Sequence, residues 1–337
     1  MKKRMYGILL PATLLVLLCF FLVPFNKQTQ TDADTIRIGY HPNFGGASAV
    51  FLGMEEGYFS DEGLKVELVS FTSGPPSIAA LKAGDIDISF LGHGASSFLL
   101  EGDIQVVAVD SLSYAEQLIV RNDSLINSVA GLQGKKVATP FGTSGENFLD
   151  MILYMNGIPR ENVNVINYDI NGAVTAIVSG RVDAVSIWAP YSREIEEAGS
   201  GKVKTLVDCR DLKGILYLPM CWVAGEKYID GNTQAVERFV RALYRSMDYR
   251  AEHLNDAAGL VSKNLGIDAH TLQQDLDIAE WLTSASMKEY LTNRSVLKWY
   301  RDQHVFFMQK NPYDRAVPVE TYLRLDIMEQ VLLGGGG

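Results

Sequence analysis

The feature that most constrains the fold of this chain is a corner that occurs twice. The sequence ALKAGDIDISFLG, residues 80–92, is typical of a helix end, a glycine turn and a short apolar strand. The sequence AIVSGRVDAVSIW, residues 176–188, repeats the helix end, the glycine, the second aspartate and the apolar strand. This likeness predicts two copies of one supersecondary unit.

The segments before each corner support the duplication. Period-two apolar patterns predict strands, and glycine or hydroxyl residues separate them from longer helical patterns. The expected elements are strand 35–42, helix 47–56, strand 64–71 and helix 72–84 in the first copy, and strand 134–141, helix 143–155, strand 162–169 and helix 171–180 in the second. Each copy, closed by its apolar strand, is a βαβαβ unit with parallel strands, so the chain is predicted to be an α/β protein.

Two such units predict two lobes with a ligand cleft between them. A chain of 337 residues, 47% of them hydrophobic, is long enough for two domains. Ligands of parallel sheets bind outside the carboxyl ends of the strands, where helix N-termini present free N–H groups. If two such edges face each other, a connection that crosses twice makes a hinge. We expect crossings near 110–119 and 214–223, which assigns residues 36–115 and 219–333 to lobe 1 and residues 116–218 to lobe 2.

The N-terminus predicts export. Basic residues 2–4 precede an apolar run at 5–25, which fits a signal peptide or an uncleaved membrane anchor. An atypical lipoprotein is the alternative, although Leu18 stands before Cys19 where a small residue is expected. Residues 26–35 are polar and resemble a tether, and residues 334–337 are expected to form a flexible tail. The body is therefore predicted to be extracytoplasmic and tethered to the membrane.

Charge and motif spacing exclude several classes of partner. The net charge of -10 provides no basic patch, so no nucleic acid is expected. His41 and His93 have no third ligand at metal-site spacing, so they are expected to pack or donate hydrogen bonds. The segment 92–97 nearly matches a dinucleotide fingerprint, but it follows the third strand and ends in Ser97 where a glycine belongs. We expect neither a metal nor a cofactor.

The exported body contains two cysteines, Cys209 and Cys221. A disulfide between them and a pair of buried free thiols both fit the sequence.

Several stretches together resemble one family. They are GMEEGYFSDEGLKVELV (53–69), AALKAGDIDISFLG (79–92), LQGKKVATPFGTS (132–144) and GRVDAVSIWAPY (180–191). This ensemble is similar to the periplasmic solute-binding proteins of ABC importers, in the nitrate, sulfonate, taurine and thiamine-precursor group, from about residue 36 to residue 328. The resemblance implies a monomeric, two-lobed periplasmic-binding fold of type II that closes on a small organic ligand and delivers it to a permease and its ATPase.

The loops expected at the strand ends supply the candidate ligand-binding residues. Small and hydroxyl residues let a ligand approach the N–H groups of helix starts, and aromatic rings provide flat walls. Capping by Ser96 or Thr143, and aromatic rings that simply pack in the core, are the alternatives. The candidates are Tyr40, His41, Asn43, Ser73, His93, Gly94, Ala95, Thr143, Ser144, Glu146, Asn171, Trp188 and Tyr191.

The prediction of the ligand class depends on Glu146. A carboxylate near this helix start either pairs with an ammonium or N–H group of the ligand or serves only as a first-turn acid. The expected loops contain no Arg or Lys before Arg193, which disfavours a doubly charged anion. We therefore expect a zwitterionic or neutral-polar ligand of sulfonate or taurine type. A pyrimidine-type thiamine precursor or an amino-acid-like compound remains the alternative.

An enzyme is the rival class, because a pyrimidine-synthesising branch resembles the same family. Such an enzyme would need a cofactor lysine and a histidine in the cleft, and the expected loops contain no lysine. The segment FGTSGE does not match a G-x-S-x-G elbow, and Ser144 has no evident His and Asp partners. We expect no catalysis. A membrane-tethered sensor built on the same domain is a third possibility, because the sequence does not name the partner.

Overall fold

The first sheet of the computed structural model, which describes residues 34–310 and 316–334, has six strands in the order β11-β4-β10-β3-β1-β2. They are β1 (Asp34–Tyr40), β2 (Leu64–Ser70), β3 (Ile88–Leu91), β4 (Ile104–Ser113), β10 (Pro219–Gly225) and β11 (Ala279–Trp281). Strand β1 is parallel to β2 and β3, whereas β10 is antiparallel to both β3 and β4. The expected leader at 1–25 and nearly all of the expected tether and tail lie outside the described residues.

The second sheet has five strands in the order β7-β6-β8-β5-β9. They are β5 (Glu116–Arg121), β6 (Lys136–Thr139), β7 (Asn164–Asn167), β8 (Ala184–Trp188) and β9 (Val203–Asp208). Strand β6 is parallel to β7 and β8, and β5 is antiparallel to β8 and β9. The spatial order β7-β6-β8-β5 therefore matches β2-β1-β3-β10, and the strand directions match as well, which confirms the predicted duplication.

The repeated corner performs the same structural task in both copies. Gly84 and Gly180 each have φ of 77°, a left-handed conformation that glycine adopts without steric cost. The aspartate three residues after the glycine then accepts a hydrogen bond from the first strand of its own βαβαβ unit. Asp87 accepts from the backbone N–H of Arg37 at 2.8 Å, and Asp183 accepts from that of Lys136 at 2.9 Å. The corner recurs because each unit must join the start of its third strand to the start of its first.

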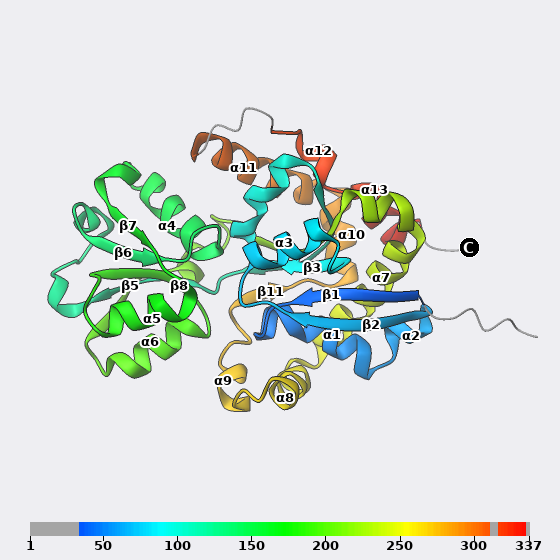
Figure 1. Cartoon of the computed structure of the whole chain (residues 1–337), viewed down its shortest axis with the longest axis horizontal. Coiled ribbons are helices and arrows are strands. Elements are labelled where there is room, and N and C mark those ends of the chain that lie inside the picture. Colours follow the sequence, from blue (N-terminus) through cyan, green and yellow to red (C-terminus); the bar gives the residue numbers. More distant parts are fainter. Residues whose placement is uncertain (1–33, 311–315, 335–337) are drawn as a thin grey trace, which may run out of the picture. The chain divides into compact units, whose positions relative to one another are not determined.

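Helices cover both sheets (Figure 1). In the two duplicated units they are α1 (Phe44–Glu55), α2 (Tyr58–Asp61), α3 (Gly74–Ala83), the 3₁₀ segment η3 (His93–Glu101), α4 (Ser144–Met155), α5 (Ile170–Val178) and α6 (Tyr191–Gly199). Shorter 3₁₀ turns are η4 (Asn122–Ser124), η5 (Val129–Leu132), η6 (Arg160–Asn162) and η7 (Cys209–Leu212). The C-terminal helices are α7 (Glu226–Glu252), α8 (Leu254–Leu265), α9 (Ala269–Gln273), α10 (Ser284–Thr292), α11 (Ser295–Lys310), α12 (Val319–Tyr322) and α13 (Leu325–Leu332).

The second sheet shows how the pattern of side chains places its helices. Val137 belongs to the same buried cluster as Phe148 of α4, whereas the next residue, Ala138, belongs to a cluster with Ile177 of α5 and Ile195 of α6. Successive strand residues point to opposite faces, so α4 covers one face and α5 and α6 cover the other. Figure 1 shows the same arrangement.

The first sheet carries most of the core. Helix α7 buries an apolar stripe that consists of Val236, Phe239, Val240, Leu243 and Met247. Phe239 packs on Trp222 of β10 at 5.9 Å between ring centroids. Trp222 donates from Nε1 to Asp110 of β4 at 3.1 Å, and Asp110 is also paired at 3.0 Å with the buried guanidinium of Arg250. This buried group anchors β4 to α7 a few residues before the chain leaves the sheet.

The chain passes between the sheets twice. It leaves β4 at Ser113 and begins β5 at Glu116, then leaves β9 at Asp208 and re-enters the first sheet at Pro219. Both passages overlap the expected ranges. The assignment of residues to two lobes stays a prediction, because sheet membership does not by itself show which residues move together.

Two further features bear on the sequence predictions. Cys209 and Cys221 are free, buried thiols, so of the two possibilities left open the structure has no disulfide between them. Burial raises the pKa of the Cys221 thiol to about 12. Among the residues that the structure describes, no helix combines the length and apolar character that crossing a membrane requires.

Candidate ligand-binding site

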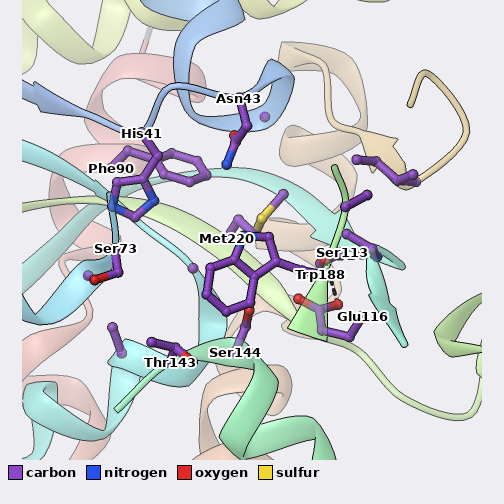
Figure 2. Close-up of a pocket in the computed structure, with 17 residues that line it drawn as sticks. His41, Asn43, Ser73, Phe90, Ser113, Glu116, Thr143, Ser144, Trp188 and Met220 are labelled. Carbon is purple, nitrogen blue, oxygen red and sulfur yellow. Dashed lines mark hydrogen bonds between the residues drawn. The ribbon is translucent and has the colours of Figure 1, made fainter. Parts of the chain in front are cut away.

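A small pocket of about 50 Å³ lies among residues from both sheets (Figure 2). Its lining comes from the ends of the strands, the helix starts that follow them and the first passage between the sheets. The lining residues are His41, Asn43, Gly45, Ser73, Gly74, Phe90, Gly92, Ala95, Ser113, Ala115, Glu116, Thr143, Ser144, Trp188, Ala189, Met220 and Ile278.

Helix starts surround the pocket. Asn43, Ser73 and Thr143 are the N-cap residues of α1, α3 and α4, and all three line the pocket. The Asn43 side chain accepts from the N–H of Gly46 at 2.8 Å, which explains why α1 begins at Phe44, before the expected Ala47. Ser73 and Thr143 make no such capping bond with their side chains. Free N–H groups at the start of α4 therefore remain available to a polar solute, whereas Pro75 and Pro76 in the first turn of α3 have no N–H group to offer.

His41 contributes an unsatisfied polar atom. Only 7% of the residue is exposed, and its Nε2 has no hydrogen-bond partner among the described residues. Burial lowers the pKa of His41 to about 4, against a smaller opposing effect of a hydrogen bond to the Ser73 backbone. The ring is therefore neutral at neutral pH and offers hydrogen bonding without charge.

Glu116 is a pocket residue that sequence reasoning missed. It begins β5 directly after the first passage, and only 2% of it is exposed. Its Oε2 accepts from Ser113 Oγ at 2.8 Å, and its Oε1 lies 3.0 Å from Nε2 of His93. Burial would raise the pKa of Glu116, but the charge of His93 and hydrogen bonds from neighbouring side chains outweigh it and lower the pKa. Glu116 is accordingly a buried, ionised carboxylate at the pocket wall.

The remaining walls are apolar. Trp188, at the end of β8, lines the pocket and stands edge-on to Tyr191 with 6.0 Å between ring centroids. Ala115, Ala189 and Ile278 form a small buried cluster against Trp188, beside the passage between the sheets. The polar groups therefore face a compact apolar surface, which is the usual composition of a small-molecule pocket.

The structure brings together about half of the candidate residues. Those that line the pocket are His41, Asn43, Ser73, Ala95, Thr143, Ser144 and Trp188. Those outside the lining are Tyr40, His93, Gly94, Glu146, Asn171 and Tyr191. Tyr40 packs on Phe51, with 5.3 Å between ring centroids, and Asn171 is exposed at the start of α5. His93 is fully buried behind Glu116, and its Nδ1 lies 2.8 Å from Nδ2 of Asn147 in α4.

Glu146 has a different environment from the one expected. Its Oε1 pairs with Nη2 of Arg160 at 2.7 Å, and its Oε2 accepts from the N–H of Gly142 at 2.8 Å. Arg160 also pairs with Asp150 of the same helix. The carboxylate thus holds the loop before α4 against a cation of its own sheet unit and does not line the pocket. That Glu146 pairs with a cation of the ligand stays a prediction, and in this structure its charged partner is Arg160.

Gly94 also differs from expectation. It was expected to admit the ligand, but a Cβ at this position would lie 2.1 Å from the carbonyl carbon and oxygen of Thr143. The missing side chain lets the start of η3 touch the start of α4, so Gly94 permits contact between the two sheet units. A second such contact joins Arg193 of α6 to Asp275, which follows α9.

Within residues 34–310 and 316–334, no cluster of three or more His, Cys, Asp or Glu side chains could hold a metal ion. Of the residues that the structure describes, neither a free thiol nor a lysine lines the pocket. The groups on the pocket wall are suited to binding through hydrogen bonds, one carboxylate and apolar contact.

Comparisons with known proteins agree with this geometry. A family model described as NMT1/THI5 like matches residues 46–257. A Bacillus subtilis (strain 168) protein named as an aliphatic sulfonates-binding protein is 31% identical over 308 residues, which cover 88% of each chain. The structure of the periplasmic aliphatic sulphonate binding protein SsuA from Escherichia coli has a TM-score of 0.67 at 21% identity, over 89% of this chain and 99% of that one.

One solved structure of similar fold is an enzyme. The desulfurization enzyme DSZB matches with a TM-score of 0.65 at 16% identity, over 89% of this chain and 99% of that one. At such identity the match shows a shared fold and nothing about chemistry.

Proposed function

Because the chain belongs to the NMT1/THI5-like family, we propose that it is the extracytoplasmic solute-binding component of an ABC importer. It captures a small organic solute between two lobes that close about the passages at 113–116 and 208–219. The observation that carries the proposal is a single pocket lined from both sheets at the starts of α1, α3 and α4. A solute seated there contacts both lobes, so binding favours the closed arrangement.

The partners follow from this role. A permease and its ATPase receive the solute, and the binding protein acts as a monomer tethered to the outer face of the membrane. The basic residues 2–4 and the apolar run at 5–25 support export and tethering. The names of the relatives favour a sulfonate or taurine-like solute, with a pyrimidine-type thiamine precursor or an amino-acid-like compound as the alternative.

The rival proposals predict different partners and products. A pyrimidine-precursor synthase or a desulfurising enzyme would consume its solute, whereas a binding protein returns it unchanged. A sensor would bind the same solute without supporting its uptake.

Titration calorimetry of the full chain against a library of small solutes tests the proposal. The library contains alkanesulfonates, taurine, amino acids and aminopyrimidines. We expect one solute class to bind with a stoichiometry of one and to be recovered chemically unchanged by mass spectrometry. Failure to bind any small solute would contradict the proposal, and conversion of the solute would favour an enzyme.

Uptake separates an importer from a sensor. Deletion of the chain in its host should abolish uptake of the solute that binds, and expression of the full chain should restore it. Uptake at the normal rate in the deletion strain would favour the sensor.

A further inference from the structure

The ionisable side chains in the pocket lining indicate which charge a solute can carry. Among its lining residues there is no Lys or Arg, and His41 is neutral at neutral pH because burial lowers its pKa to about 4. Glu116 is the one acidic side chain in the lining. The His93 ring, whose Nε2 lies 3.0 Å behind Glu116, offsets part of the charge of this carboxylate. A solute that carried only negative charge would still meet the carboxylate, and no cationic side chain, among the described residues of the lining, an arrangement that is electrostatically unfavourable.

The Glu116 carboxylate has capacity for a further donor. Two oxygens offer about four acceptor positions. One position faces His93 Nε2, one accepts from Ser113 Oγ, and Ser144 adds a side-chain hydrogen bond. The Nε2 of His41 is a further hydrogen-bonding atom on the pocket wall, and it has no partner among the described residues. Figure 2 shows both side chains reaching into the pocket from different elements.

We propose that the bound solute carries an ammonium or N–H donor group that pairs with Glu116, so that Glu116 selects amino-bearing solutes over simple anionic sulfonates. This inference rests on the proposed function and narrows its ligand class. It retains the zwitterionic class expected from the sequence but assigns the selecting carboxylate to Glu116, on the pocket wall, instead of Glu146.

A positive group is also favoured by the aromatic wall. Trp188 lines the same pocket, and a cation near the face of an indole ring gains electrostatic attraction, most strongly when water is excluded. The opposite end of the solute can use the N–H groups at the start of α4, whose N-cap Thr143 leaves them without a side-chain cap.

Matched pairs of probes test the role of the amino group. They are taurine against ethanesulfonate, β-alanine against propionate, and an aminopyrimidine against the same ring without its amino group. Titration of the full chain at neutral pH should show at least tenfold tighter binding of the amino-bearing member in one or more pairs, as expected for a hydrogen bond to a charged group. In Glu116→Gln that preference should fall below about threefold while the member without the amino group keeps its affinity.

Two variants control for folding and for general loss of charge. Glu116→Asp keeps the carboxylate and should retain part of the preference. Glu146→Gln removes a carboxylate that pairs with Arg160 outside the pocket lining, and it should leave the preference unchanged. Retained binding of the member without the amino group shows that Glu116→Gln is folded.

Several results would overturn the proposal. One is equal or tighter binding of the member without the amino group in every pair that binds. Another is an equal loss for both members in Glu116→Gln, because this would mean that Glu116 only holds His93. If the library solutes that bind all lack an ammonium or N–H donor group, the ligand class is wrong and the proposed function stands. If no library solute binds at all, both fail.

Discussion

Gly94→Ala tests whether the contact between the two sheet units is needed for binding. The added Cβ would lie 2.1 Å from the carbonyl carbon of Thr143 and 2.3 Å from the N of Ser144. Ordinary van der Waals contact begins at 3.4 Å, so the start of α4 must withdraw by about 1.3 Å (3.4 minus 2.1). The obstructing atoms belong to the backbone, so no change of side-chain rotamer can relieve the clash.

The withdrawal should weaken binding more than folding. A shift of about 1.3 Å would stretch the 2.8 Å contact between His93 and Asn147 beyond hydrogen-bond range, and it would move Thr143 and Ser144 away from the solute. Two lost hydrogen bonds cost about 1–3 kcal/mol, which corresponds to roughly five- to 150-fold in affinity. The passages between the sheets can absorb the motion, so the free energy of unfolding without solute should change less than the free energy of binding.

Titration calorimetry and thermal unfolding of the same variant measure both quantities. Gly225→Ala is the matched control for a glycine replacement, because its Cβ would meet nothing within 4 Å, Gly225 has a φ of -68° and the residue lies outside the pocket lining. Only Gly94→Ala should prevent full closure. An unchanged dissociation constant for Gly94→Ala would refute the reasoning, since closure would then not require this contact.

Three other substitutions test separate parts of the site. Trp188→Ala should weaken solute binding about tenfold or more through loss of the apolar wall, as measured by calorimetry, and unaltered affinity would place the solute elsewhere. Arg193→Gln should speed solute dissociation in stopped-flow measurements, because it breaks the ion pair with Asp275. The control Arg245→Gln breaks an exposed ion pair within the first unit and should leave the dissociation rate unchanged. Equal dissociation rates in the two variants would exclude a role of the Arg193–Asp275 pair in closure. Burial lowers the pKa of His41 to about 4 in the folded protein, against 6.5 in the unfolded chain. As the pH falls, the unfolded chain therefore protonates at this residue before the folded protein does. The free energy of unfolding should fall by about 3 kcal/mol between about pH 6.5 and about pH 4. Urea unfolding at several pH values measures this change, and the free energy of unfolding should depend less on pH in His41→Asn. The same pH dependence in both proteins would exclude His41 as its source.

The fold was predictable because its determining signals are local. The glycine corner at 84–87 and its copy at 180–183 can be read from a few adjacent residues, and the topology of βαβ units then places the strand ends at one edge. That placement found His41, Asn43, Ser73, Thr143 and Ser144 correctly as neighbours in the pocket.

The sequence did not indicate contacts between residues that lie far apart in the chain. Arg160, which pairs with Glu146, lies beyond the helix that Glu146 begins, so the loop alone gave no sign of it. Ile278 reaches the pocket from a segment after the duplicated units, where no repeat marks its place. Glu116 did have a signal, a single acid among mostly apolar neighbours at the predicted passage, but its neighbourhood was assigned to the hinge and not to the site.

Closure on a solute is the central claim, and small-angle X-ray scattering with and without the solute identified by calorimetry tests it most directly. A two-lobed binding protein should show a smaller radius of gyration when saturated, and Gly94→Ala should show a smaller decrease than the native chain at the same saturation. An identical radius of gyration in the free and saturated native protein would contradict the account.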